Sequence, residues 1–202
     1  RAPGTDMLTA EAIRSDFMKA AHSFPAEIEK IEHYFSAANN KGKVRAPIAE
    51  GVDVPIYILG SSTESAHLAA QKGLPYAFAS HFATNHLMHA LKIYREEFKP
   101  SEVLEKPYTI AGVNVIVADT DEEAQRLFTS LIRMFFGILT GTSQPLHAPI
   151  EMTEDLKDIF QHPSLNQMLK YSFVGTKETV KQQTTAFLED TQADELIMVS
   201  TI

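Results

Sequence analysis

Hydrophobic positions along the chain follow two spacings in turn, and the spacings predict alternating strands and helices. Short apolar or β-branched runs, typical of strands buried on both faces, lie at 54–59, 75–80, 108–118 and 195–202. Apolar residues at helical spacing lie between them, at about 62–72, 84–98, 120–135 and 176–188. This order of elements predicts βα units and a parallel sheet, hence an α/β fold.

The remaining segments give weaker signals. Before the first strand, Thr9 is a candidate N-cap for one helix, and Ser23 with Pro25 predicts the start of a second. Residues 137–149 are rich in Gly, Thr, Ser and Pro, which favours a long exposed loop. We therefore expect a single domain over 1–202, with a long loop or excursion at 137–170.

Composition narrows the functional classes. The chain has 202 residues, 44% of them hydrophobic, and a net charge of -8. An acidic surface argues against a nucleic-acid binder and against docking on an anionic membrane. There is no cysteine, no apolar run near the roughly 20 residues of a membrane span, and no signal-peptide pattern at the start. We expect a cytoplasmic protein, and a sequence that opens on Arg1 rather than Met suggests a start inside a longer chain or after processing.

The strongest chemical signal lies where the first predicted strand meets a helix. Gly60, Ser61, Ser62 and Ser65 fall at this junction, where free backbone N–H groups and the helix dipole favour an anion. Gly60 permits a close backbone approach, and the serines offer hydroxyl donors to a phosphate. The alternative is that these serines only cap the helix and fill its first turn. Glu64 would repel a phosphate, so it must point away if the phosphate hypothesis holds.

Several segments together resemble the bacterial luciferase-like family of flavin-dependent monooxygenases. They include PIYILGSS at 55–62 and AAQKGLPYAFASHF at 69–82. The others are RAPGTD at 1–6, GVNV at 112–115, ADTDEEA at 118–124, YSFVG at 171–175 and ADEL at 193–196. The resemblance runs in order over the whole chain and is weakest between 137 and 169.

The resemblance implies a TIM (β/α)₈ barrel, here incomplete, from about the end of the fourth strand to the eighth. It implies FMN at the C-terminal ends of the strands, with Arg1 matching the arginine that pairs with the flavin phosphate. Ser61, Ser62 and Ser65, next to Gly60, match the serine-rich turn that holds the same phosphate. Luciferase itself has an acidic residue near the Ser61 position, so the sequence departs from it there.

Two further residues and the reaction follow from the same resemblance. Ser80 and His81, at the end of the sixth barrel strand, are expected to open onto the flavin ring or the substrate. The implied activity uses reduced FMN and O₂ to oxygenate an unidentified small organic molecule, with a separate flavin reductase as a partner and a homodimer as the assembly. The family's active-site histidine matches a position before Arg1, so the catalytic residues are not assigned.

Alternative functions remain open. A relative that uses the deazaflavin F420 for hydride transfer would show similar phosphate positions, and a non-catalytic flavin-binding protein would share the scaffold. An inert fragment with uncovered sheet edges is a third alternative, since open edges invite a partner chain. His81, His86 and His89 lack nearby acidic partners in sequence, so we expect no metal. No Gly-x-Ser-x-Gly motif is present, which argues against a serine hydrolase.

Overall fold

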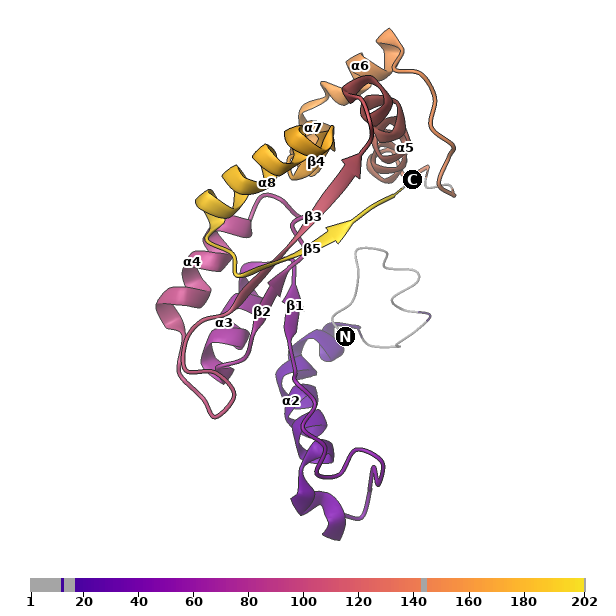
Figure 1. Ribbon diagram of the computed structural model, residues 1–202. Helices are drawn as coiled ribbons and strands as arrows, with labels where there is room; N and C mark the ends of the chain where they lie inside the picture. The colour runs from indigo at the N-terminus through magenta and orange to yellow at the C-terminus, as the bar shows by residue number, and fades with distance from the viewer. Residues whose placement is uncertain (1–11, 13–16, 143–144, 202) are drawn as a thin grey trace. The chain divides into compact units, whose positions relative to one another are not determined.

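The computed structural model describes residue 12, residues 17–142 and residues 145–201 (Figure 1). The contacts group the chain into two compact units, residues 1–55 and 56–202. Each unit is described by itself.

Residues 17–55 of the first unit contain one α-helix and one 3₁₀ turn, followed by turns and irregular chain. Helix α2, Phe17–Phe35, runs through Pro25, and a 3₁₀ turn, η1, follows at Ala37–Lys41. The prediction of a new helix at Ser23 is therefore wrong, because proline removes only one N–H and the other helical bonds continue the element. The candidate N-cap Thr9 lies outside the described residues.

The second unit contains a parallel sheet of five strands. The strands are β1 (Ile58–Gly60), β2 (Tyr76–Phe78), β3 (Thr109–Val117), β4 (Ser172–Gly175) and β5 (Glu195–Val199). β1 pairs with β2 and β2 with β3, while β3 also pairs with β5 along its first half and with β4 along its last residues. The four predicted strands and their parallel order are confirmed, and β4 is an addition that the sequence pattern did not predict.

Helices follow the strands as the pattern predicts. They are α3 (Thr63–Lys72), α4 (Leu87–Glu97), α5 (Asp121–Leu139) and α8 (Lys177–Thr191). The excursion at 137–170 is not all loop, because it contains α6 (Glu154–Phe160) and α7 (Pro163–Met168). These short helices form because Leu156 and Leu165 are buried in the apolar cluster beneath α5.

Strand register places particular side chains on one face of the sheet. Ala77 lies opposite Ile110, and Ile110 opposite Glu195, and paired residues in neighbouring strands point to the same side. Alternation along β3 then puts Gly112 and Asn114 on the Ile110 face, towards the C-terminal ends of the strands. Figure 1 shows α4 and α8 along one side of the strands.

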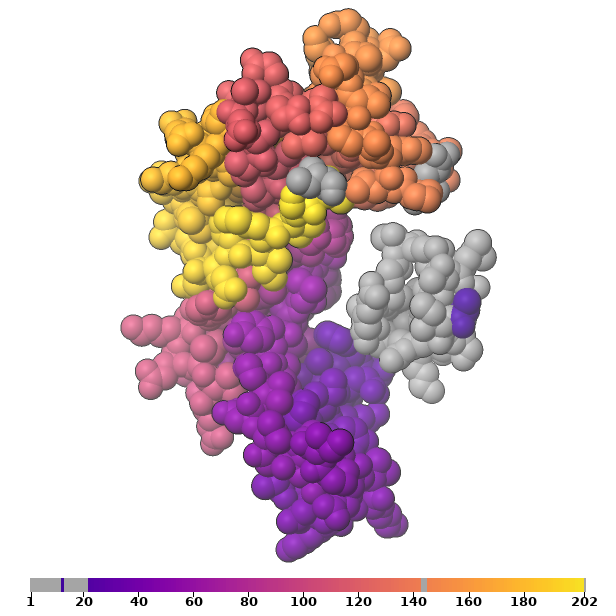
Figure 2. Space-filling model, turned by 45° about the vertical axis from the view of Figure 1, so that its right-hand side comes forward, coloured from indigo at the N-terminus to yellow at the C-terminus, as the bar shows by residue number. Residues whose placement is uncertain are grey.

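The outer strands β1 and β5 are only partly covered by the described residues. Leu59 of β1 is 63% exposed, and Ile197 and Met198 of β5 are 47% and 57% exposed. The segment that contains β5, coloured yellow, lies at the surface in the space-filling view (Figure 2). The apolar core therefore lies between the middle strands and their helices.

Candidate functional site

The predicted anion site lies at the start of α3, directly after β1. Ser62 is the N-cap residue, in an extended conformation (φ -141°, ψ 169°), but its side chain makes no capping hydrogen bond. Ser61 is exposed. The alternative in which Ser62 caps the helix through its hydroxyl is therefore not what the structure shows, and Ser61 and Ser62 directly precede the first turn of α3.

Gly60 and Ser65 lie against each other in the structure. Ser65 Oγ donates to the carbonyl oxygen of Ser62 (2.7 Å) and lies 3.1 Å from the hydroxyl of buried Tyr76, which itself donates to Ser62 O (3.2 Å). A Cβ on Gly60 would overlap the Ser65 side chain. Gly60 thus makes room for the Ser65 side chain, whose hydroxyl is hydrogen-bonded within the protein.

Glu64 turns back onto the helix start instead of pointing away. Its pKa lies below the ordinary value because its carboxylate accepts a hydrogen bond from its own backbone N–H and a second from the Ser62 side chain. The condition placed on Glu64 by the phosphate hypothesis is therefore not met in this conformation. The lowered pKa of Glu64 is in line with the preference of a helix start for negative charge.

The structure brings Gly60, Ser61, Ser62 and Ser65 together at one strand–helix junction. Arg1, the expected charge partner of the phosphate, lies outside the described residues. Tyr76 was missed by the sequence reasoning, although a tyrosine in an otherwise apolar strand is a signal that a polar partner lies nearby.

Ser80 and His81 lie beyond the end of β2 and are fixed to β3. Ser80 is fully buried and donates from Oγ to the carbonyl oxygen of Gly112 (2.6 Å). Asn114, also buried, donates from Nδ2 to the carbonyl oxygen of His81 (2.7 Å) and to Oγ of Ser172 (3.2 Å). Ser80 was expected to open onto a pocket, but its hydroxyl is occupied by the sheet, because β3 presents a carbonyl directly beside it.

The His81 ring is half-buried against β3. A Cβ on Gly112 would lie 2.5 Å from Nδ1 of His81 and 3.4 Å from Cε1, so only glycine admits the ring in this position. Nδ1 is buried and has no hydrogen-bond partner among the described residues. Burial lowers the pKa of His81, which favours the neutral ring at neutral pH. Gly112 and Asn114 were part of the family resemblance, but the sequence reasoning gave neither a role.

A hollow of about 510 Å³ lies beside this histidine, between the turn after β2 and helix α7. The Phe82 ring packs edge-on against the His81 ring, with centroids 4.7 Å apart, and also lines the hollow. Thr84 Oγ1 donates to the carbonyl oxygen of Gln167 (2.6 Å), and the Gln167 amide donates back to Thr84 Oγ1 (2.9 Å). The turn and α7 are thus joined across the hollow, whose described lining contains no Asp, Glu, Lys or Arg.

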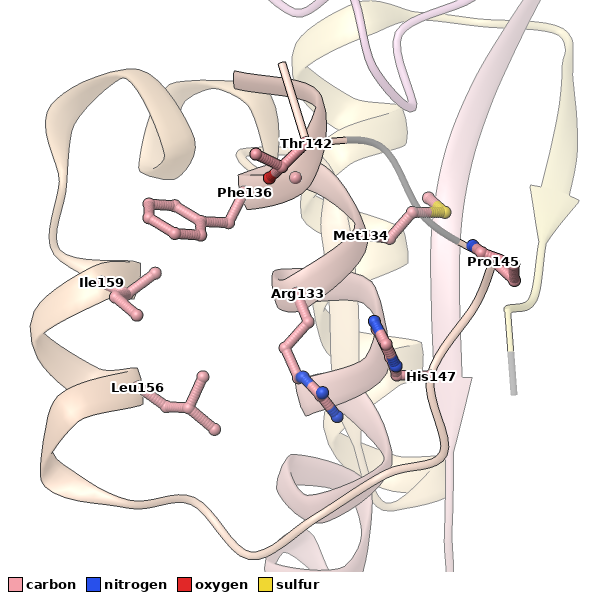
Figure 3. A pocket seen from close by; sticks show the side chains of 9 residues that line it. Arg133, Met134, Phe136, Thr142, Pro145, His147, Leu156 and Ile159 are labelled. Atoms are coloured by element: carbon pink, nitrogen blue, oxygen red, sulfur yellow. The ribbon is translucent and has the colours of Figure 1, made fainter. Parts of the chain in front are cut away.

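A second hollow, of about 250 Å³, lies between α5, α6 and the segment that joins them (Figure 3). Leu156 and Ile159 of α6 point towards α5, and Arg133 and His147 contribute the nitrogen-bearing side chains. Arg133 donates to the carbonyl oxygen of Ala148 (3.3 Å). Among the described residues, none of the predicted site residues lines this hollow.

The remaining histidines do not form a metal centre with their neighbours. His86 and His89 are both exposed, at the start and in the first turns of α4. Within the described ranges, no three His, Cys, Asp or Glu side chains are grouped to hold a metal ion. Over the same ranges, no helix has the length and apolar character needed to cross a membrane.

Known proteins resemble this chain in sequence and in fold. The uncharacterized protein YvbT of Bacillus subtilis (strain 168) is 42% identical over 201 residues, which are 99% of this chain and 60% of that protein. A protein of Escherichia coli (strain K12) named luciferase-like monooxygenase is 38% identical over 198 residues, 98% of this chain and 59% of that protein. The crystal structure of apo-MsnO8 has a TM-score of 0.79 and 26% identity, covering 100% of this chain and 61% of that one.

These matches confirm the predicted fold, part of a luciferase-like (β/α)₈ barrel. The chain spans about 60% of the length of the curated relatives it matches. The family profile described as luciferase-like monooxygenase matches residues 16–195. The parallel sheet, the polar groups at its C-terminal ends and these similarities lead to one conclusion: the chain belongs to the luciferase-like monooxygenase family.

Proposed function

We propose that this chain belongs to an FMN-dependent monooxygenase that uses reduced FMN and O₂ to oxygenate a small organic substrate. The observation that carries the proposal is the start of α3 at the C-terminal end of the parallel strand β1, where the Ser62 side chain makes no capping hydrogen bond. The backbone N–H of Glu64 and the Ser62 side chain lower the pKa of the Glu64 carboxylate there. In (β/α)₈ enzymes this end of the strands carries the active site. Membership of the luciferase-like family supports the phosphate of a flavin as the anion that binds there.

The residues at this junction fit a phosphate group if Glu64 rotates away. Glu64 is exposed, so its side chain can move into solvent without breaking the core. The hydroxyls of Ser61 and Ser62 and the first N–H groups of α3 would then hold the phosphate oxygens. Arg1 would add the full positive charge, as the resemblance implies.

The bound flavin would supply the electrons that activate O₂, and the protein would orient the flavin and keep water away from it. His81 and Phe82 lie at the strand ends, and the hollow that Phe82 lines is suited to the organic substrate. Since its described lining is apolar or uncharged, we propose a neutral substrate with apolar parts. A separate flavin reductase and a homodimeric assembly complete the proposal, as in the family resemblance.

The test is a titration of the full-length protein with FMN, oxidised and reduced, followed by flavin fluorescence and absorbance. We expect saturable binding, weakened in Arg1→Ala and in Ser62→Ala, with Ser101→Ala as a control serine that lies outside the site. Consumption of O₂ by the reduced complex would support an oxygenase. Binding without any reaction with O₂ would indicate a flavin carrier, and binding of F420 in place of FMN would indicate the hydride-transfer alternative.

A further inference from the structure

The His81 ring is held by two residues of β3 in an orientation that distinguishes its two nitrogens. The edge formed by Nδ1 and Cε1 faces Gly112, where a Cβ would lie 2.5 Å and 3.4 Å from those atoms. The opposite edge carries Nε2. The ring as a whole is only half-buried, and Nε2 is not among the buried polar atoms that lack a partner.

The backbone of His81 is fixed as firmly as its ring. The two protons of the Asn114 amide go to the carbonyl oxygen of His81 and to Ser172 Oγ, which ties the end of β2 to both β3 and β4. The preceding residue, Ser80, donates to Gly112 O. A rotation of this turn that exposes Nδ1 would therefore break two hydrogen bonds, Ser80 to Gly112 and Asn114 to His81.

The buried position of Nδ1 selects the protonation state of the ring. Nδ1 has no partner among the described residues in either tautomer, but a buried N–H without an acceptor is rarer in proteins than a buried acceptor without a donor. The charged ring needs a proton on both nitrogens, so it would also place an N–H there. Burial is the one cause of the lowered pKa of His81, without a contribution from a charged neighbour in the described chain. The favoured state is the neutral ring with its proton on Nε2.

We infer that Gly112 and Asn114 are positioning residues that hold Nδ1 of His81 against β3, so that His81 offers Nε2–H as a hydrogen-bond donor to bound FMN. The orientation follows from the structure, and only the identity of the acceptor rests on the proposed function. In this role His81 donates a hydrogen bond in its neutral form and does not remove a proton from the substrate.

The orientation can be tested without any cofactor, by long-range ¹H–¹⁵N NMR of the histidine rings in the full-length protein. The His81 signals are assigned by their loss in His81→Asn. We expect the Nε2–H form, with a pKa below the ordinary 6.5. Asn114→Ala and Gly112→Ala should move the pKa back towards that value, while the control Ser172→Ala, which leaves the bond to His81 O, should not. A proton on Nδ1, or unchanged His81 signals in Asn114→Ala, would overturn the inference.

The donor role is tested by FMN affinity in two isosteric replacements. A glutamine amide reaches about as far as Nε2 and an asparagine amide about as far as Nδ1. We therefore expect His81→Asn to weaken FMN binding about five- to tenfold, the value of one hydrogen bond, and His81→Gln to stay within about twofold. Equal affinities in both variants would overturn the donor role alone. Absence of FMN binding in the unsubstituted protein would refute both the donor role of His81 and the proposed function. The NMR result would still decide whether Gly112 and Asn114 position the His81 ring.

Discussion

At the residue scale, Glu64 is the side chain that most directly opposes a phosphate at the start of α3. Glu64→Gln keeps the size of the side chain and removes its charge, so we expect FMN to bind about three- to tenfold more tightly. Fluorescence titration measures the change. The control is Glu178→Gln, which removes a carboxylate from the first turn of α8 instead. Equal or weaker binding in Glu64→Gln would show that the phosphate does not lie at this helix start.

Tyr76 gives a prediction for alkaline pH. Burial raises the pKa of Tyr76 to about 12, above its ordinary value of 10.0. The neutral hydroxyl is therefore favoured in the folded protein, and the stability it contributes is present below pH 10 and lost as the pH rises from 10 through 12.

Tyr76→Phe removes the titrating hydroxyl. At neutral pH the variant should be less stable by roughly 1 kcal/mol, because its hydrogen bonds at Ser62 and Ser65 are lost. Above pH 10 it should lose less stability than the unsubstituted protein, as followed by urea unfolding across pH. The exposed Tyr57→Phe is the matched control. A parallel decline of the two proteins above pH 10 would contradict the prediction.

The residues of the site show what a sequence can and cannot reveal. The positions of Ser61 and Ser62 were predictable, because a buried strand that ends in glycine and serines before a helix has few possible backbone paths. The orientation of the Glu64 side chain and the hydrogen bond between the hydroxyls of Ser65 and Tyr76 were not predictable. Both depend on side-chain rotamers, and the second also depends on a strand that is distant in sequence. The same applies to Gly112, whose missing Cβ matters only because His81 packs on it.

At the element scale, Asp194 joins β5 to β3 at the start of both strands. Its Oδ2 accepts hydrogen bonds from the Thr109 backbone N–H (2.7 Å) and hydroxyl (2.9 Å), and its own N–H donates to Thr109 O (2.9 Å). Asp194→Ala leaves the Thr109 donors unpaired, so we expect a loss of about 1.5–3 kcal/mol in the free energy of unfolding. Urea unfolding measures it, with the exposed Asp190→Ala of α8 as control. A loss no larger than that of the control would show that the pairing of β3 and β5 does not depend on this carboxylate.

Elements with long apolar patterns in the sequence were predicted, whereas β4, α6 and α7, which have few apolar residues, were not. α5 and β3 have many apolar residues at one spacing, so their identity is set locally. β4 has only Phe173 and Val174 as apolar residues, and it becomes a strand because it pairs with the end of β3. α6 and α7 likewise depend on burial of single leucines under α5, which no local pattern reveals.

At the scale of the whole molecule, the net charge of -8 at pH 7 opposes self-association, and the sequence pI is about 5.5. Apolar residues of β1 and β5 are exposed in the described part of the chain. We therefore expect the hydrodynamic radius, measured by light scattering, to grow as the pH is lowered from 7 to 5.5. A shift to alkaline pH increases the negative charge and should leave the radius unchanged. A constant radius at the pI would show that charge does not control association.

The pairing of β3 also has a consequence for synthesis on the ribosome. β3 ends at Val117, whereas β4 begins at Ser172 and β5 at Glu195. While the chain emerges, β3 can pair with β2, but the hydrogen-bonding groups reserved for β4 and β5 stay open until those later segments appear. The nascent chain therefore carries an unpaired strand edge for much of its synthesis. A slow translation step between 117 and 195 would lengthen the period in which chaperones, or another nascent chain, can bind that edge.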